Sequence, residues 1–447
     1  MRRAAALIPL LGVIGCAYYN GLYNARSLVR RAESASRDGR DSLAVAAWRE
    51  AASKADTVLR RYPRSRWTDD ALLLSGTSSA LSGDCTHGLA RLAQWQAHPG
   101  ADARARARVA VARGTCLVRL GQHAQALDTL RPFISHREAT LSRLAAAWAA
   151  RAALATGLED SAVVFARTAR SDALDAHLAS VALASGRVPL AERFLRQRAD
   201  EWRSLSAVEP LLMRLSQSSA AAADSIVSIA TRGRASRLER ARLLLAAGAW
   251  SERSHDLLRA RGHYERALEM TADTVVVSDV LTRLGLMEVR NAATIADAQS
   301  HLDRTRRQIR RPALASADTT LRLVTRLATV SDTTGASLFL AAELARDALG
   351  ARRLASALFR EVGQKYPASS LAPKAALAIA DLWPDSATAL RSKVRADYAT
   401  SPYVQLLDGK PVTSPLLDQD NRLLRQAWAR LKLSVDSASV ASERPRP

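Results

Sequence analysis

The chain has 447 residues and a formal net charge of +22, and 48% of its residues are hydrophobic but only 5% are aromatic. Alanine, leucine and arginine dominate, which favours helix, whereas the residue types that strands prefer are scarce, so the composition predicts an all-α protein and excludes a mainly β fold. The positive charge is mostly arginine spread along the chain rather than gathered in one block, which argues against a nucleic-acid-binding protein.

The first element is a short export signal. Arg2 and Arg3 precede an apolar run over residues 4–14, which is too short to span a bilayer because a span takes about 20 apolar residues. Val13-Ile14-Gly15-Cys16 resembles the signal of bacterial lipoproteins. The resemblance implies that residues 1–15 are a signal peptide and that Cys16 is lipidated. The alternatives are a plain signal peptide with an incidental cysteine and an uncleaved anchor.

The residue after Cys16 bears on the destination of the chain. Ala17 is not the aspartate that retains lipoproteins at the inner membrane of enteric bacteria. The resemblance therefore implies a protein held by lipid on the periplasmic face of the cell outer membrane. Acyl chains anchor it through about 0.8 kcal/mol per buried methylene. Export also argues against nucleic acid as the partner.

Helical periodicity begins soon after the signal. The spacing of apolar residues predicts helices over 22–37 and 41–62, and Pro63 ends the second. Thr68 begins the next helix as a capping hydroxyl, followed by two acidic residues, and Gly83 breaks it. Helices over 85–97 and 101–120 follow, separated by Pro99-Gly100.

Cys85 and Cys116 lie on the two helices that flank this turn, about 14 residues before it and 16 after it. At about 1.5 Å per residue, both lie roughly 20–25 Å from the turn of an antiparallel hairpin and face each other. In an oxidising compartment this arrangement predicts a disulfide. Two buried thiols are the alternative.

Local patterns recur along the chain at intervals of roughly 30–40 residues. Tyr62-Pro63-Arg64-Ser65 returns as Tyr366-Pro367-Ala368-Ser369 and, more loosely, as Tyr398-Ala399-Thr400-Ser401. Between the copies, glycines break the helical pattern at Gly83, Gly121, Gly157, Gly186 and Gly262. A period of this length with paired helices predicts an α-solenoid of helix–turn–helix repeats.

The repeats resemble the tetratricopeptide repeat. The matching residues are its Leu-Gly, later Ala and final Pro at Leu120, Gly121, Ala124 or Ala126, and Pro132, and again Gly262, Tyr264, Ala267 and Leu268. The leading Trp of that repeat is missing. We assign tetratricopeptide-like repeats to 16–132, degenerate helical repeats to 133–337, further repeats to 338–433 and a disordered tail to 434–447. A helix over 418–433, with Trp428 and Leu431 on one face, caps the array.

Together, the lipidated cysteine, the repeats and the Tyr-Pro-x-Ser boundaries resemble the outer-membrane assembly lipoproteins of the BamD family. The likeness covers residues 16–132 and 338–407, and the chain is longer than the family expects. The resemblance implies a scaffold whose concave face holds a protein or extended peptide, with the β-barrel assembly machinery as the candidate partner. An envelope scaffold that binds anionic lipid or glycan through its arginines is the alternative.

The sequence contains no catalytic motif and no His/Cys spacing typical of a metal site, so we expect neither an enzyme nor a cofactor. His255 and His263 flank an expected turn and are interpreted as surface residues. The densest basic run is a candidate contact site for anionic lipid or an acidic partner; its arginines are Arg304, Arg306, Arg307, Arg310 and Arg311. A solvated helix end, where arginine suits the negative terminus, is the alternative.

Overall fold

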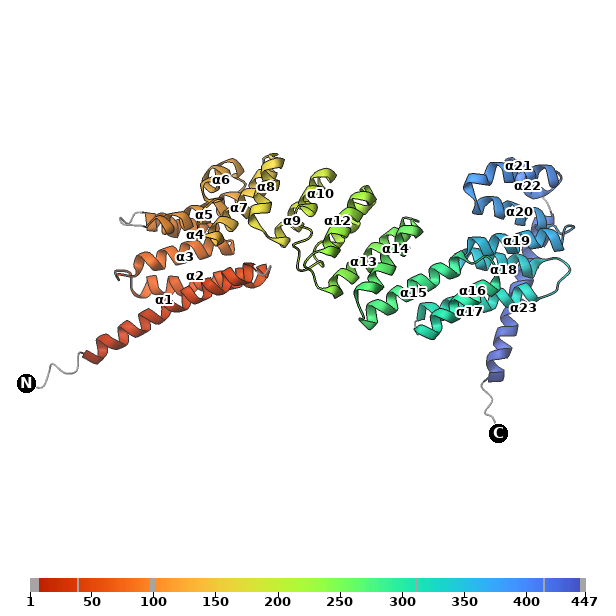
Figure 1. The fold of residues 1–447 in the computed structure, drawn as a ribbon, viewed down its shortest axis with the longest axis horizontal. Coiled ribbons are helices and arrows are strands. Elements are labelled where there is room, and N and C mark those ends of the chain that lie inside the picture. The colour runs from red at the N-terminus through yellow and green to blue at the C-terminus, as the bar shows by residue number, and fades with distance from the viewer. Residues whose placement is uncertain (1–7, 38–39, 97–101, 310–311, 413–414, 443–447) are drawn as a thin grey trace, which may run out of the picture. The chain divides into compact units, whose positions relative to one another are not determined.

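The computed structural model describes residues 8–37, 40–96, 102–309, 312–412 and 415–442 (Figure 1). Throughout these ranges the chain forms helices and no strand, which confirms the all-α prediction. Contacts divide the chain into two units, Met1–Trp250 and Ser251–Pro447. No helix in the described ranges is both long and apolar enough to cross a membrane.

The first unit contains α1 (Ile8–Arg37), α2 (Asp41–Arg61), α3 (Thr68–Ser82), α4 (Cys85–Gln96), α5 (Ala103–Arg119), α6 (His123–Leu130), α7 (Ala139–Ala155), α8 (Glu159–Ala169), α9 (Asp172–Ala184), α10 (Val188–Arg196), α11 (Glu209–Ser218), α12 (Ala220–Arg232) and most of α13 (Arg237–Arg253). The second contains α14 (Leu257–Met270), α15 (Thr274–Asn291), α16 (Ile295–Gln308), α17 (Pro312–Thr329), α18 (Ala336–Asp347), α19 (Arg352–Lys365), α20 (Leu371–Leu382), α21 (Ala387–Asp397), α22 (Pro402–Leu407) and α23 (Pro415–Ser442).

Consecutive helices pack against one another in both units. In the first unit, α1 packs on α2, α2 on α3 and α3 on α4, and α5 also contacts both α3 and α7. Stacked helix pairs of this kind form an α-solenoid, in which each pair buries its apolar face against its neighbours. The solenoid predicted from the repeat period is therefore confirmed.

Small residues allow the helices of the first unit to approach closely. Gly88 on α4 lies so near α3 that a Cβ atom there would be 2.7 Å from the backbone nitrogen of Ala80. Ala71 is completely buried, and Ala112 is only 2% exposed. The abundant alanine of the sequence thus serves the packing between helices as well as helix propensity.

Glycine ends several helices as the sequence predicts. Gly83, Gly121, Gly157 and Gly186 adopt φ angles of 104°, 76°, 78° and 73° just after α3, α5, α7 and α9. This left-handed backbone costs glycine little, so it terminates helices without strain. The prediction for Gly262 is wrong, because Gly262 lies inside α14. The turn before α14 is formed instead by His255, with φ 60°.

The Tyr-x-x-Ser segments share one backbone conformation. The amide groups of Tyr62, Tyr366 and Tyr398 each donate to the carbonyl four residues earlier, over 2.9 Å in all three copies. The serine three residues later then donates its amide to the tyrosine carbonyl in each copy. The recurrence seen in the sequence is therefore a recurrence of structure.

Three predictions about helix starts and ends need correction. The third helix begins at Thr68 itself, whose hydroxyl donates to the carbonyl of Ser65 at 2.8 Å and does not cap the helix. The helix predicted over 22–37 is longer at its start, because α1 begins at Ile8 and runs through Cys16 without interruption. Residues 1–7 of the expected signal lie outside the described ranges. Helix α23 extends to Ser442, so residues 434–442 are helical rather than a disordered tail; residues 443–447 lie outside the described ranges.

The second unit has a core formed by α15–α20 and α23. Phe339 and Phe359 meet edge-on in it, with ring centroids 5.1 Å apart. Helix α23 contributes Leu431, which is 6% exposed, but Trp428 is 45% exposed. The prediction that both residues share the capping face is therefore wrong, because Leu431 packs in the core beside Ala427 whereas Trp428 does not.

Candidate functional site: a polar groove between α2 and α4

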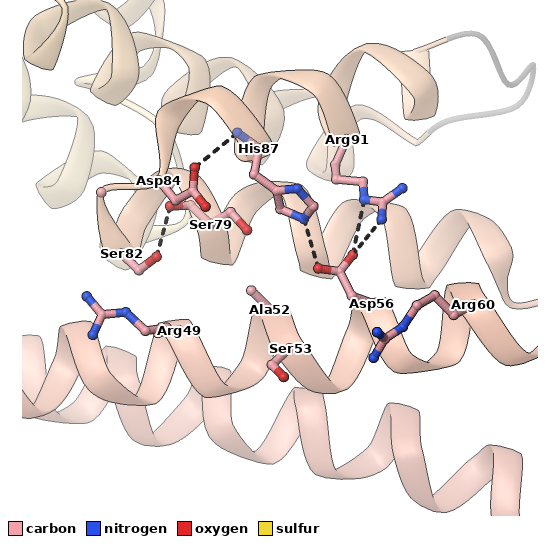
Figure 2. Close-up of a pocket in the computed structure, with 11 residues that line it drawn as sticks. Arg49, Ala52, Ser53, Asp56, Arg60, Ser79, Ser82, Asp84, His87 and Arg91 are labelled. Carbon is pink, nitrogen blue, oxygen red and sulfur yellow. Dashed lines mark hydrogen bonds and ion pairs between the residues drawn. The ribbon is translucent and has the colours of Figure 1, made fainter.

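A groove of about 790 Å³ lies between α2 and α4, above the C-terminal end of α3 (Figure 2). It belongs entirely to the first unit. Its lining combines basic, acidic and hydroxyl side chains, whose apolar atoms expose nearly as much surface as the polar ones, and consists of Arg49, Ala52, Ser53, Asp56, Arg60, Ser79, Ser82, Gly83, Asp84, His87 and Arg91.

Helical spacing explains how α2 forms one wall. Arg49, Ser53, Asp56 and Arg60 are separated by four, three and four residues, and such residues share one face of a helix. Apart from Ala52, which also lines the groove, apolar residues of α2 such as the completely buried Ala55 face its neighbours. This helix therefore packs through its apolar face and presents a polar stripe to the groove.

The turn between α3 and α4 forms the opposite wall. Gly83 reverses the chain, and the Asp84 carboxylate then accepts a hydrogen bond from the His87 amide at 3.1 Å, which caps the start of α4. The first turns of α4 carry His87 and Arg91, four residues apart and directed at α2 (Figure 2). The cap thus fixes where both side chains enter the groove.

Asp56 of α2 joins the two walls, because its carboxylate contacts side chains of α4. Its Oδ1 accepts hydrogen bonds from the Ser75 hydroxyl at 2.8 Å and from Arg91 Nε at 3.1 Å, while its Oδ2 lies 2.8 Å from His87 Nε2. A second guanidinium nitrogen of Arg91 lies 3.0 Å from Oδ1. The Asp56 side chain is 20% exposed, so it is accessible from the groove but partly shielded from water.

Arg49 and Arg60 stand at the two ends of the groove (Figure 2). Both are exposed, and neither forms an ion pair with any residue that the structure describes; Arg60 donates to the hydroxyl of Thr57 at 3.3 Å. Their separation of 11 residues along α2 corresponds to about 16 Å between backbones. The groove therefore has two cations at its ends and an anchored carboxylate between them.

A disulfide fixes the helix that carries His87. Cys85 and Cys116 are bonded, with Cα atoms 5.4 Å apart, which joins the start of α4 to α5. This is the pair that the hairpin argument selects from the sequence. Because Cys85 lies two residues before His87, the bond also holds one wall of the groove in place.

A second polar cluster lies in the central region that the sequence marks as degenerate. Asp175 on α9 is completely buried and lies 2.9 Å from Arg198, which also contacts Asp172 at 3.2 Å and Glu201 at 3.3 Å. Burial raises the pKa of Asp175 to about 7, against the opposing effect of Arg198. The cluster attaches the connection between α10 and α11 to α9, and it has a structural role.

The arginine run predicted as a contact site is only partly available. Arg304 and Arg307 are exposed on α16, without an ion pair to the described residues. Arg306 lies 2.9 Å from Asp318 on α17 and joins the two helices. Arg310 and Arg311 lie outside the described residues. At least one of the five arginines therefore serves packing between helices.

The histidine prediction is half right. His255 is exposed at the turn, but His263 is buried, with 6% of its surface exposed. It lies inside α14, which continues through Gly262 although the sequence predicts a break there. Across the described ranges, no group of three His, Cys, Asp or Glu side chains is arranged to hold a metal ion.

The groove itself is absent from the sequence predictions. The polar stripe on α2 was available as a signal, because its members recur at helical spacing. Asp56 meets His87 and Arg91 across 31 and 35 residues, however, and no local pattern reveals such a pairing.

Comparison with protein-family models gives no match, and comparison with curated proteins gives none either. Among solved structures, the chain is similar to a protein described as a circular tandem repeat protein with novel repeat topology and enhanced subunit contact surfaces. The two are 14% identical, with a TM-score of 0.19, and the match covers 96% of this chain and all of the other. At this level of similarity, the match carries no argument about function.

Proposed function

We propose that this chain is a lipid-anchored scaffold on the periplasmic face of the outer membrane that binds a protein partner. The proposal rests on one observation above all, the groove between α2 and α4. It offers both donors and acceptors on a helical array, and such arrays commonly bind extended segments of other proteins. The lipoprotein-like signal at Cys16 supports the location, and the likeness to the BamD family suggests the β-barrel assembly machinery as the partner.

The groove changes where on the array we place the partner. Helices of one row lie closer together on the inside of a curved array, and α5 contacts both α3 and α7, so we take the row of α3, α5 and α7 as the inner one. The groove opens between α2 and α4, in the other row. The proposal therefore assigns the contact to this outer groove rather than to the concave face expected from the sequence.

A site-specific photo-crosslinker tests the proposal in intact cells. Ser53 is exposed within the groove, so a crosslinking residue there should trap a component of the β-barrel assembly machinery. Val164 on α8 is 60% exposed and outside the groove, and provides the matched control. A crosslinked assembly component at Ser53 and not at Val164 supports the proposal. Identical products at both positions, or no assembly component at Ser53, would contradict it.

A second candidate function is binding to anionic lipid or glycan. It is favoured by the net charge of +22 and by Arg304 and Arg307, which are exposed without ion pairs to any described residue. Such binding depends on screened charges, so vesicles containing anionic lipid should release the chain as salt rises, since the Debye length falls from ~10 Å at 0.1 M to ~3 Å at 1 M. Arg304→Gln with Arg307→Gln should weaken it, and salt-independent binding would contradict it.

A further inference from the structure

We infer that the groove between α2 and α4 binds an extended acidic peptide segment, in which two carboxylates pair with Arg49 and Arg60 and an N–H group donates to Asp56. The inference rests on the proposed protein-binding function and names the chemistry of the segment that is bound. It depends on the charges that line the groove, on the distance between Arg49 and Arg60, and on the ability of the Asp56 carboxylate to accept one more hydrogen bond.

The charges of the groove select an anionic ligand that also carries donors. Arg49, Arg60 and Arg91 outnumber Asp56 and Asp84 by three to two, so the lining has an excess of positive charge. The two cations at the ends have no ion-pair partner in the part of the chain that the structure describes. A free guanidinium is well suited to a carboxylate, which it binds through two parallel hydrogen bonds.

Asp56 distinguishes a peptide from a simple anion. Its Oδ1 already accepts from Ser75 and from two nitrogens of Arg91, but Oδ2 has only His87 as a donor. A carboxylate oxygen accepts about two hydrogen bonds, so Oδ2 retains capacity for one more. A phosphate would be repelled at this point, whereas a peptide amide would be bound. The middle of the groove therefore favours a main chain over a lipid headgroup.

Distance sets the spacing of the two carboxylates. Arg49 and Arg60 are 11 residues apart on α2, or about 16 Å. An extended chain advances about 3.3 Å per residue and only residues an even number of positions apart share a face, so two residues four positions apart lie about 13 Å apart on one face. The segment bound best should carry acidic residues four positions apart, with small polar residues between them facing Ser53 and Asp56, and the long arginine and glutamate side chains span the remaining distance of about 3 Å.

The experiment measures peptide binding to the full chain in a non-ionic detergent by fluorescence anisotropy. The probe is a labelled nine-residue peptide of Gly and Ser with two Glu residues four positions apart; the comparison peptides have adjacent Glu residues or Gln in place of Glu. We expect the spaced peptide to bind most tightly. Equal affinity for the Gln peptide would overturn the inference.

Variants at the ends of the groove then locate the site. An exposed ion pair contributes about 0.2–1 kcal/mol, so Arg49→Gln and Arg60→Gln should each weaken binding up to about five-fold, and together more than either alone. Arg61→Gln is the matched control, because Arg61 is exposed on α2 beside Arg60 but does not line the groove. An equal loss from Arg61→Gln would indicate non-specific charge attraction and would overturn the inference. Each variant should fold, because none of the three arginines forms an ion pair with a residue that the structure describes.

Two further arms separate the other ligands. If inorganic phosphate, or vesicles with anionic headgroups, bind in a manner that needs Arg49 and Arg60 while the spaced peptide does not, the groove is a phosphate site and the inference fails. The double variant also separates this inference from the proposed function. If it still captures the assembly machinery in cells, the scaffold function stands and the groove assignment alone is wrong.

Discussion

The bond between Cys85 and Cys116 should make a large and measurable contribution to the stability of the first unit. The cysteines are 31 residues apart in the sequence. On the chain-entropy account, closing a loop of this length removes unfolded-state entropy equivalent to about 3.7 kcal/mol at 25 °C. The bond also attaches α4, which carries one wall of the groove, to α5. Reduction should therefore destabilise the first unit and loosen the wall of the groove that α4 forms.

Urea unfolding with and without reductant measures this contribution. We expect the unfolding midpoint of the wild type to fall on reduction, with a loss of about 2–4 kcal/mol in the free energy of unfolding. The control is the double variant Cys85→Ala with Cys116→Ala, which should resemble the reduced protein and be unaffected by reductant. Equal midpoints for the oxidised and reduced wild type would refute the reasoning. Reaction of both cysteines with a thiol reagent in the denatured, unreduced chain would refute the bond itself.

Three other predictions concern packing, ionisation and the anchor. Gly88→Ala should destabilise the first unit by about 1–3 kcal/mol because its Cβ would lie 2.7 Å from the Ala80 backbone nitrogen. Gly262→Ala should instead stabilise the second unit by about 0.5–1 kcal/mol, because its Cβ would have nothing within 4 Å and alanine favours the helix interior. Thermal unfolding measures both changes, and equal effects of the two variants would contradict the close packing at Gly88. Burial raises the pKa of Asp175 to about 7, so the folded chain binds the Asp175 proton more tightly than the unfolded chain does. The contribution of protonated Asp175 to the free energy of unfolding is therefore lost as pH rises from about 4 to about 7. The stability of Asp175→Asn relative to the wild type should therefore rise over that range, and a flat difference in urea unfolding would contradict the pKa. Cys16→Ala should abolish incorporation of labelled palmitate and release the chain from membranes, and persistent labelling would show that Cys16 is not the lipidated residue.

The sequence predicts most of the helices because their ends are encoded locally. Pro63 and the glycines at 83, 121, 157 and 186 have strong backbone preferences that do not depend on distant partners. Gly262 shows the limit of this reasoning, since glycine permits a turn but does not require one. The turn was formed by His255, whose positive φ angle is uncommon for its residue type.

The candidate site was harder to predict because it depends on distant residues. The helical spacing of Arg49, Asp56 and Arg60, at intervals of seven and four residues, is visible in the sequence, but solvated faces of helices show the same spacing. Only the packing of α4 against α3 brings His87 and Arg91 to Asp56. The prediction that Trp428 packs on the array is wrong for a related reason. The face of α23 that is buried depends on how the helix docks and not on the periodicity of α23 alone.

The central claim is that this chain binds a protein partner at the outer membrane. Mild crosslinking in intact cells, followed by purification of a C-terminally tagged chain and identification of what accompanies it, tests this most directly. A variant that retains Cys16 but lacks residues 41–433 is the control for capture by the anchor alone. We expect a component of the β-barrel assembly machinery with the full chain and not with the control. Recovery of only other lipoproteins or glycan, or the same products from both chains, would contradict the claim.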